Sequence, residues 1–84
     1  MTKRKPPRSN ELKDYHINIF YSIDDEGYIA DIPDLHYCSA FGNTPEEALA
    51  ELIRAKSAWL QSARELGRPI PEPVYRPAIY QAVS

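Results

Sequence analysis

The sequence predicts a small α+β protein: a three-stranded antiparallel sheet with one long helix, in the order β-β-β-α, plus an extended C-terminal arm or short strand. Three observations predict this fold. Residues 15–23 alternate between apolar and polar, an acidic turn at 24–27 leads into a second strand-like segment, and a helix-capping sequence at 44–47 opens an amphipathic stretch. The chain has 84 residues, which is room for one domain.

The first strand is expected over residues 15–23. Every second residue there is apolar or aromatic, which is the period of a strand with one buried face. The residues of that face are Tyr15, Ile17, Ile19, Tyr21 and Ile23. The turn that follows ends in Gly27, which can adopt a positive φ.

The second strand is expected over residues 28–32, and it ends at Pro33 because proline cannot donate to a ladder. A short third strand is expected over residues 38–41. A four-residue loop at 24–27 gives the first two strands a register that keeps all apolar partners on one face. The predicted pairs are Ile23 with Tyr28, Tyr21 with Ala30, and Ile19 with Ile32.

The helix has the clearest local signal in the chain. Thr44 fits the N-cap, Pro45 fits the first helical position, and Glu47 closes a capping box. Apolar residues then recur at helical spacing over residues 48–66. Gly67 stands where a helix-terminating glycine belongs.

The two ends of the chain differ from its body. Residues 1–13 form a flexible basic arm with five basic residues and one acidic residue, whereas the domain over 14–84 has five basic and eleven acidic residues. Such an arm either aids solubility or contacts phosphate. Residues 69–77 contain four prolines and must be extended. Residues 78–83 fit a last strand, paired within the chain or with a neighbouring chain.

Composition argues against several classes of protein. The single cysteine, Cys38, cannot form the intrachain disulfides that stabilise small secreted proteins. No apolar run is as long as a membrane span or the apolar region of a signal peptide. We therefore expect a cytoplasmic protein without a membrane partner.

His36 and Cys38 share one side of an extended chain, but they lack the third group of a nucleophilic site, and with His16 they lack paired metal-ligand spacing. We expect no enzyme, no cofactor and no metal.

Three residues predict a contact surface instead. Phe20, Ile29 and Phe41 fall on the outer side of the expected sheet, where they face either a second copy or a different partner. Asp31 and Asp34 offer negative charge near that surface to a cationic partner. One further candidate lies in the terminal segment: Tyr80 either joins the interface or packs back on its own sheet.

The ordered set of motifs over residues 15–73 resembles the HicB family of antitoxins. After the aromatic first strand, the matching pieces are Glu26-Gly27-Tyr28, Ala30-Asp31-Ile32-Pro33-Asp34-Leu35, Cys38, Gly42-Asn43-Thr44-Pro45-Glu46-Glu47-Ala48, Trp59-Leu60, Gly67 and Ile70-Pro71-Glu72-Pro73. The chain departs from the family at His36-Tyr37, where the family often has Pro-Gly before the cysteine.

The resemblance implies a partial RNase H-like fold and a protein that binds and masks HicA, a small basic toxin that cleaves RNA. Many family members also carry a C-terminal DNA-binding domain, and the residues after Pro73 are too few for one. We expect a homo-dimer or tetramer, with contact to DNA or RNA left open. The alternative function is a stand-alone, self-associating interaction module with weak nucleic-acid contact through the basic arm.

Overall fold

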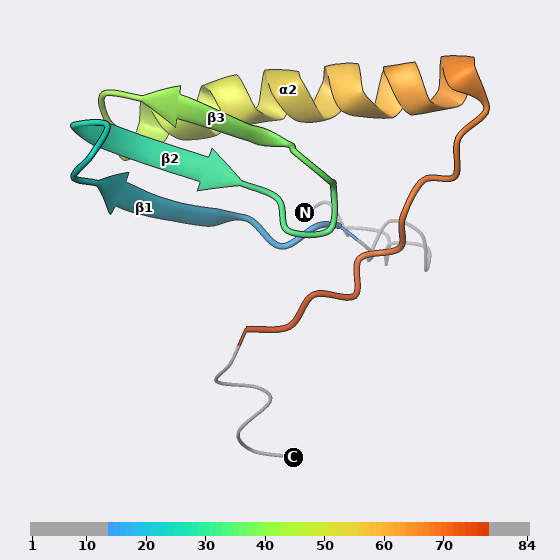
Figure 1. Cartoon of the computed structure of the whole chain (residues 1–84), viewed down its shortest axis with the longest axis horizontal. Helices are drawn as coiled ribbons and strands as arrows, with labels where there is room; N and C mark the ends of the chain where they lie inside the picture. The colour runs from blue at the N-terminus through green and yellow to red at the C-terminus, as the bar shows by residue number, and fades with distance from the viewer. Residues whose placement is uncertain (1–13, 78–84) are drawn as a thin grey trace, which may run out of the picture.

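A computed structural model describes residues 14–77 of the chain (Figure 1). Its elements are β1 (Asn18–Ser22), β2 (Gly27–Asp31), β3 (Ser39–Gly42) and α2 (Pro45–Leu66). The strands form one antiparallel sheet in the order β1-β2-β3, which confirms the predicted α+β fold. Residues 68–77 form the extended arm that the prolines require. The basic arm over 1–13 and the predicted strand over 78–83 lie outside the described residues.

The ends of α2 follow the sequence signals. The hydroxyl of Thr44 accepts a hydrogen bond from the Glu47 N–H at 3.1 Å, and the Glu47 carboxylate accepts one from the Asn43 N–H at 2.5 Å. These bonds satisfy the Glu47 N–H of the first turn and the N–H of Asn43, the residue before the N-cap. At the other end Gly67 adopts φ 69°, the left-handed conformation that closes a final turn.

The helix approaches the sheet most closely at Gly42. A Cβ at this position would clash with the backbone of Glu47 and Ala48, so no side chain fits between β3 and the first turns of α2. Ala30 and Ala48 are fully buried in the core beside this contact. Small residues on both surfaces therefore let the helix lie directly on the strands.

The rest of the core comes from the connection between β2 and β3. Ile32 and Leu35 are, with Leu52, the largest fully buried side chains. Backbone hydrogen bonds fold the connection over the core: Ile32 N–H to the Cys38 carbonyl, Leu35 N–H to the Ile32 carbonyl, and Cys38 N–H to the Leu35 carbonyl. Trp59 is partly buried and packs against this core, and its Nε1 donates to the His36 carbonyl at 2.9 Å.

The predicted pairing of β1 with β2 is wrong by two residues. The structure pairs Ile19 with Ala30, Phe20 with Ile29, and Tyr21 with Tyr28. Ile23 belongs to the turn, where its carbonyl accepts the Glu26 N–H at 3.3 Å, and Glu26 rather than Gly27 takes the positive φ of 55°. Because a shift of two preserves the alternation of a strand, every residue keeps its predicted face.

The helix does not cover the sheet evenly. It packs mostly against β3, less against β2 and least against β1, and Figure 1 shows it alongside β3 with β1 farthest away. On the helix side of β1, Ile19 and Tyr21 are therefore 39% and 54% exposed. The prediction that these residues and Ile23 are buried is wrong, because one helix cannot cover three strands.

Tyr37 adopts a backbone conformation that favours glycine. Its φ is 64°, and its side chain is 91% exposed. The HicB resemblance places a glycine at this point. The loop thus keeps a turn that glycine would form without strain, although the residue has changed.

We predict that Gly42→Ala lowers the free energy of unfolding by about 2–3 kcal/mol, because the added methyl group meets helix backbone that cannot move aside. Gly67→Ala is the matched control: nothing lies within 4 Å of a Cβ there, so only the positive φ is penalised, by about 1 kcal/mol. Urea unfolding of both variants measures the difference. An equal loss in the two variants would contradict the close contact.

Candidate functional site

The side of the sheet opposite α2, hereafter the open face, carries a row of apolar side chains. The strand register places Phe20, Ile29 and Phe41 opposite one another in β1, β2 and β3. They point away from the helix because their neighbours Ala30 and Ala40 face it. Phe20 is 50% exposed and Phe41 is 44% exposed, with Ile29 half-buried between them. These three residues are termed the apolar row, and their predicted placement is confirmed.

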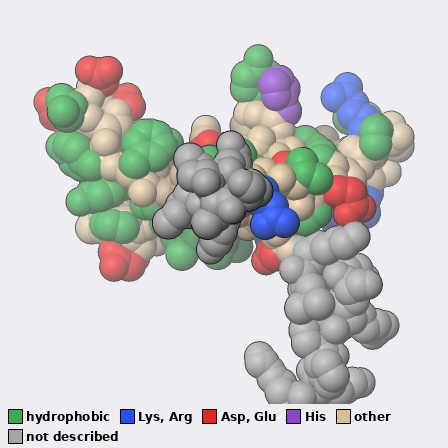
Figure 2. All heavy atoms as spheres, turned by 90° about the horizontal axis from the view of Figure 1, so that it is seen from below, with side chains coloured by type: hydrophobic (Ala, Val, Ile, Leu, Met, Phe, Trp, Pro, Cys, Tyr) green, Lys and Arg blue, Asp and Glu red, His purple; other side chains and the backbone are tan. Residues whose placement is uncertain are grey.

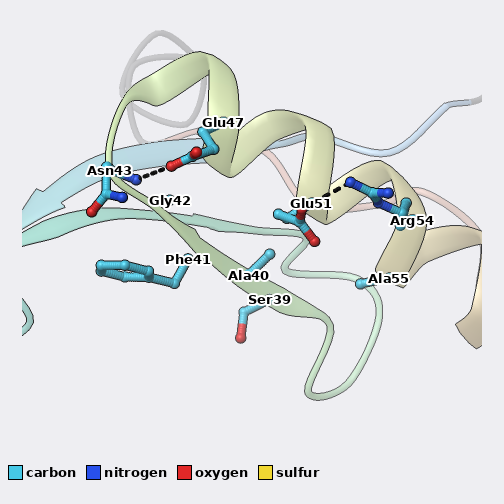
Figure 3. A pocket seen from close by; sticks show the side chains of 9 residues that line it. All are labelled: Ser39, Ala40, Phe41, Gly42, Asn43, Glu47, Glu51, Arg54 and Ala55. Atoms are coloured by element: carbon cyan, nitrogen blue, oxygen red, sulfur yellow. Dashed lines mark hydrogen bonds and ion pairs between the residues drawn. The ribbon is translucent and has the colours of Figure 1, made fainter.

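A glycine of β2 leaves room for one side chain of the apolar row. A Cβ at Gly27 would clash with the ring of Phe41, so the ring reaches over the neighbouring strand at a position without a side chain. Figure 3 shows this ring on the side of β3 away from the helix. The sequence suggested a turn role for Gly27, but the structure gives it a role in the close approach of Phe41. Gly27 and Gly42 thus allow close contacts on opposite faces of the sheet, Gly27 with the ring of Phe41 and Gly42 with the backbone of α2.

A polar row lies beside the apolar row. It consists of Asn18, Asp31 and Ser39, which are aligned by the same register. The Oδ1 atom of Asp31 is buried and has no hydrogen-bond partner among the described residues. A buried carboxylate oxygen without a donor costs free energy. Asp31 therefore places a carboxylate beside the apolar row, with its Oδ1 enclosed by the protein.

Acidic side chains gather at one end of the molecule. The β1–β2 turn and the start of α2 lie at the same end (Figure 1), and Figure 2 shows acidic side chains there. The turn is ordered by Ser22, whose hydroxyl donates to the Asp25 carboxylate at 2.8 Å. The acidic residues of this end are Asp24, Asp25, Glu26, Glu46 and Glu47. Their field attracts a basic partner toward this end of the sheet.

Asp34, in the connection between β2 and β3, contacts the C-terminal arm. Its two carboxylate oxygens accept the Tyr75 N–H at 3.2 and 3.1 Å, so it holds the C-terminal arm. The ring of Tyr75 also packs against His16, with 4.8 Å between ring centroids. Asp34 therefore has a structural role within the chain. Tyr80, the last candidate partner-binding residue, lies outside the described residues.

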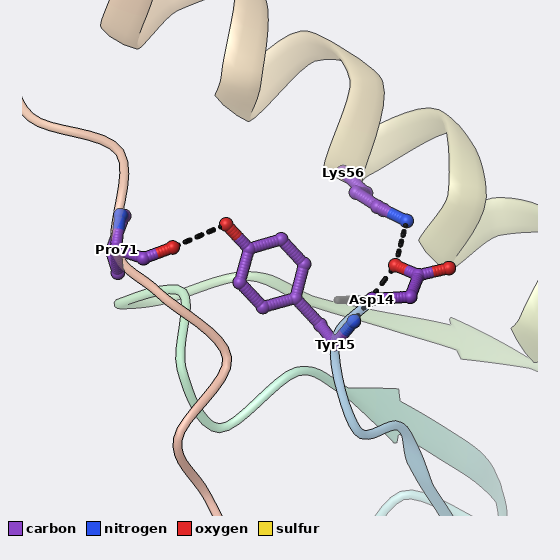
Figure 4. Close-up of polar contacts among 4 residues, drawn as sticks. All are labelled: Asp14, Tyr15, Lys56 and Pro71. Atoms are coloured by element: carbon purple, nitrogen blue, oxygen red, sulfur yellow. Dashed lines mark hydrogen bonds and ion pairs between the residues drawn. The ribbon is translucent and has the colours of Figure 1, made fainter. Parts of the chain in front are cut away.

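A second contact fixes the arm (Figure 4). The phenol of Tyr15 donates to the Pro71 carbonyl at 2.6 Å. Burial raises the pKa of Tyr15, and the negative charges of Asp34 and Glu72 add to the effect. The neighbouring Asp14 accepts a hydrogen bond from Lys56 at 2.8 Å, and this bond lowers its pKa. No local sequence pattern indicates these contacts, which join residues far apart in the chain.

Cys38 is the one thiol of the chain. Cys38 is buried in the core, and burial raises the pKa of its thiol, which keeps it protonated at neutral pH. Within residues 14–77 no group of His, Cys, Asp and Glu side chains is arranged to hold a metal ion. Over the same residues, no helix is long and apolar enough to cross a membrane.

Two open grooves flank α2. One of about 600 Å³ runs between the edge of β3 and the helix, where Glu51 and Arg54 form an ion pair at 2.9 Å (Figure 3). The other, about 690 Å³, lies between residues 36–38 and the second half of α2, beside Trp59. The first groove is lined largely by polar side chains from β3 and α2, and the second mainly by apolar ones.

We predict that stability falls above pH 10 because of Tyr15. Its pKa is raised in the folded state, so its contribution is present below the unfolded value of about 10 and is lost as pH rises through the folded pKa. Urea unfolding between about pH 8 and 11 should show a steeper loss for the wild type than for Tyr15→Phe. Tyr37→Phe, altered at an exposed phenol, should behave as wild type. Parallel curves for wild type and Tyr15→Phe would contradict the prediction.

One curated relative places the chain in a family. Over 53 residues the chain is 38% identical to the UPF0150 protein ssl0259 of Synechocystis sp., a match that spans 63% of this chain and 73% of the relative. No family model and no solved structure matches the chain.

Proposed function

The chain belongs to the UPF0150 family, and we propose that it acts as a HicB-like antitoxin, a binding protein that masks a small, basic, RNA-cleaving toxin. The observation that carries the proposal is the apolar row on the open face, next to the carboxylate of Asp31. The motif order over residues 15–73 supports the same family role. In this proposal the protein has no catalytic activity of its own.

In such a surface the apolar row would supply most of the binding affinity. Protein interfaces gain most of their affinity from a few aromatic or large side chains that become fully desolvated at the centre. Phe20 and Phe41 are half-exposed on a rigid sheet, so little conformational entropy is lost when a partner covers them. The row spans all three strands, which gives the partner a continuous apolar contact.

The acidic residues provide selectivity for a basic partner. A protein that binds RNA carries cationic groups, and an inhibitor that occupies them must present negative charge. The domain carries eleven acidic residues against five basic ones, with acids crowded at the β1–β2 turn and the start of α2. Asp31, at the end of the central strand β2, adds a carboxylate beside the apolar row.

The test is the recovery of partners from native lysate with the tagged full chain and two variants. We predict that the wild type recovers one small basic protein in near-equal amount and blocks its RNA cleavage. Phe41→Glu should reduce that recovery roughly 30-fold, the effect of losing an interface hot spot of about 2 kcal/mol. Ile53→Glu, which adds the same charge to an exposed apolar site on α2, should bind as wild type.

Two results would contradict this function. Equal recovery by Phe41→Glu, with its folding confirmed by unchanged urea unfolding, would remove the open face from the interface. A recovered partner that cleaves no RNA would remove the antitoxin role.

The alternative is a self-associating interaction module, dimer or tetramer, with weak nucleic-acid contact. The observation behind it is the basic composition of residues 1–13. It predicts recovery of the protein itself alone, together with RNA or DNA binding that is lost at moderate salt and on deletion of residues 1–8.

A further inference from the structure

The outer edge of β3 is free. Within residues 14–77, β3 pairs with β2 alone, so one side of its backbone has no partner strand there. The Ile32 N–H donates to the Cys38 carbonyl at 3.0 Å, and successive residues of a strand direct their backbone groups to opposite sides. The N–H and C=O groups of Ser39 and Phe41 are therefore directed outward, whereas those of Ala40 face β2.

This edge lacks the side chains that usually keep sheet edges apart. Natural edges are commonly protected by charged residues, by proline or by a covering segment. The strand Ser39–Gly42 carries no charge and no proline, and its outward residues Ser39 and Phe41 are exposed. The groove of about 600 Å³ between this edge and α2 leaves the edge accessible from the helix side. A second strand can therefore pair with β3.

Two opposite charges lie on either side of the middle of this edge. Ala48 lies against Gly42, and α2 runs back antiparallel to β3 from there (Figure 1). Two strand residues, from Gly42 to Ala40, span about 7 Å, and four helix residues rise about 6 Å. The point of α2 level with Ala40 is thus four residues after Ala48. Glu51 comes just before this point and Arg54 just after it, and both line the groove (Figure 3).

These features make the edge complementary to itself. A two-fold axis through the middle of β3, perpendicular to the sheet, brings β3 of a second copy alongside in the antiparallel direction. Ser39 of each copy then lies opposite Phe41 of the other, and each such pair can exchange two backbone hydrogen bonds. The same axis brings Glu51 of one copy level with Arg54 of the other, so unlike charges meet twice.

We propose that the chain forms a two-fold dimer in which β3 pairs with β3 of a second copy and the two α2 helices lie side by side on the joined sheet. Strand pairing alone is too small for a stable interface, and the helices supply the remaining contact. Ala55 and Ala58 share the side of α2 that carries Glu51, and their short side chains allow the helices to approach closely. The open faces of both copies stay uncovered on the other side of the sheet.

This self-association does not depend on the proposed function, and it is tested by sedimentation of the isolated full chain. We expect the wild type to sediment as a dimer. Glu51→Arg or Arg54→Glu alone brings like charges together across the axis, so each should raise the dissociation constant of the dimer roughly tenfold or more. An equimolar mixture of the two variants should dimerise again, because arginines of one chain then meet glutamates of the other. Ser57→Arg, at an exposed site outside the groove, should behave as wild type.

The mixture distinguishes a contact between copies from the ion pair of Glu51 with Arg54 within one chain. Each variant lacks the internal pair in the mixture as well as alone, so only a contact between copies restores association. Nuclear Overhauser effects between Ser39 of labelled chains and Phe41 of unlabelled chains should show the antiparallel pairing, with the contacts between β1 and β2 as the folding control in every sample.

Three results would overturn the proposal. The first is a wild type that remains monomeric at millimolar concentration. The second is a dimer that neither Glu51→Arg nor Arg54→Glu weakens, which would place the interface elsewhere. The third is a mixture that associates no better than its two components.

Discussion

The contact of α2 with the sheet at Gly42 determines which surfaces of this protein are free. The helix backbone lies where a side chain would otherwise stand, so α2 is fixed over β3 and β2. Within residues 14–77 one helix, α2, is present to cover the sheet. The helix side of β1 and the whole opposite face are therefore left to other parts of the chain or to partners.

The two sides of the sheet consequently have different roles. On the helix side, Ala30 and the residues of the β2–β3 connection complete a small core that fixes the strands. On the open face, the same strands present the apolar row, with Phe41 seated over Gly27. The rigidity that the core supplies is what makes the row suitable for recognition, because its side chains do not need to be ordered on binding.

Local patterns were sufficient to predict the elements and the faces. Thr44, Glu47 and Gly67 mark the two ends of the helix. Strand alternation predicts the apolar row, because a register error of two residues leaves every side chain on the same face of the sheet. The register itself depends on which residue of the turn takes a positive φ, and the sequence favoured Gly27 over Glu26. The exposure of Tyr21 and the contact of Asp34 with Tyr75 depend on long-range packing, which has no signal in local sequence.

We propose that the open face, and not the helix side, receives the partner. The decisive measurement follows the aromatic ring resonances of the isotope-labelled protein while the basic protein recovered from lysate is added. We expect the signals of Phe20 and Phe41 to shift or broaden, whereas those of Tyr28 and Trp59, which pack with the core beneath α2, stay in place. Shifts at Tyr28 and Trp59 with unchanged phenylalanine signals would contradict it.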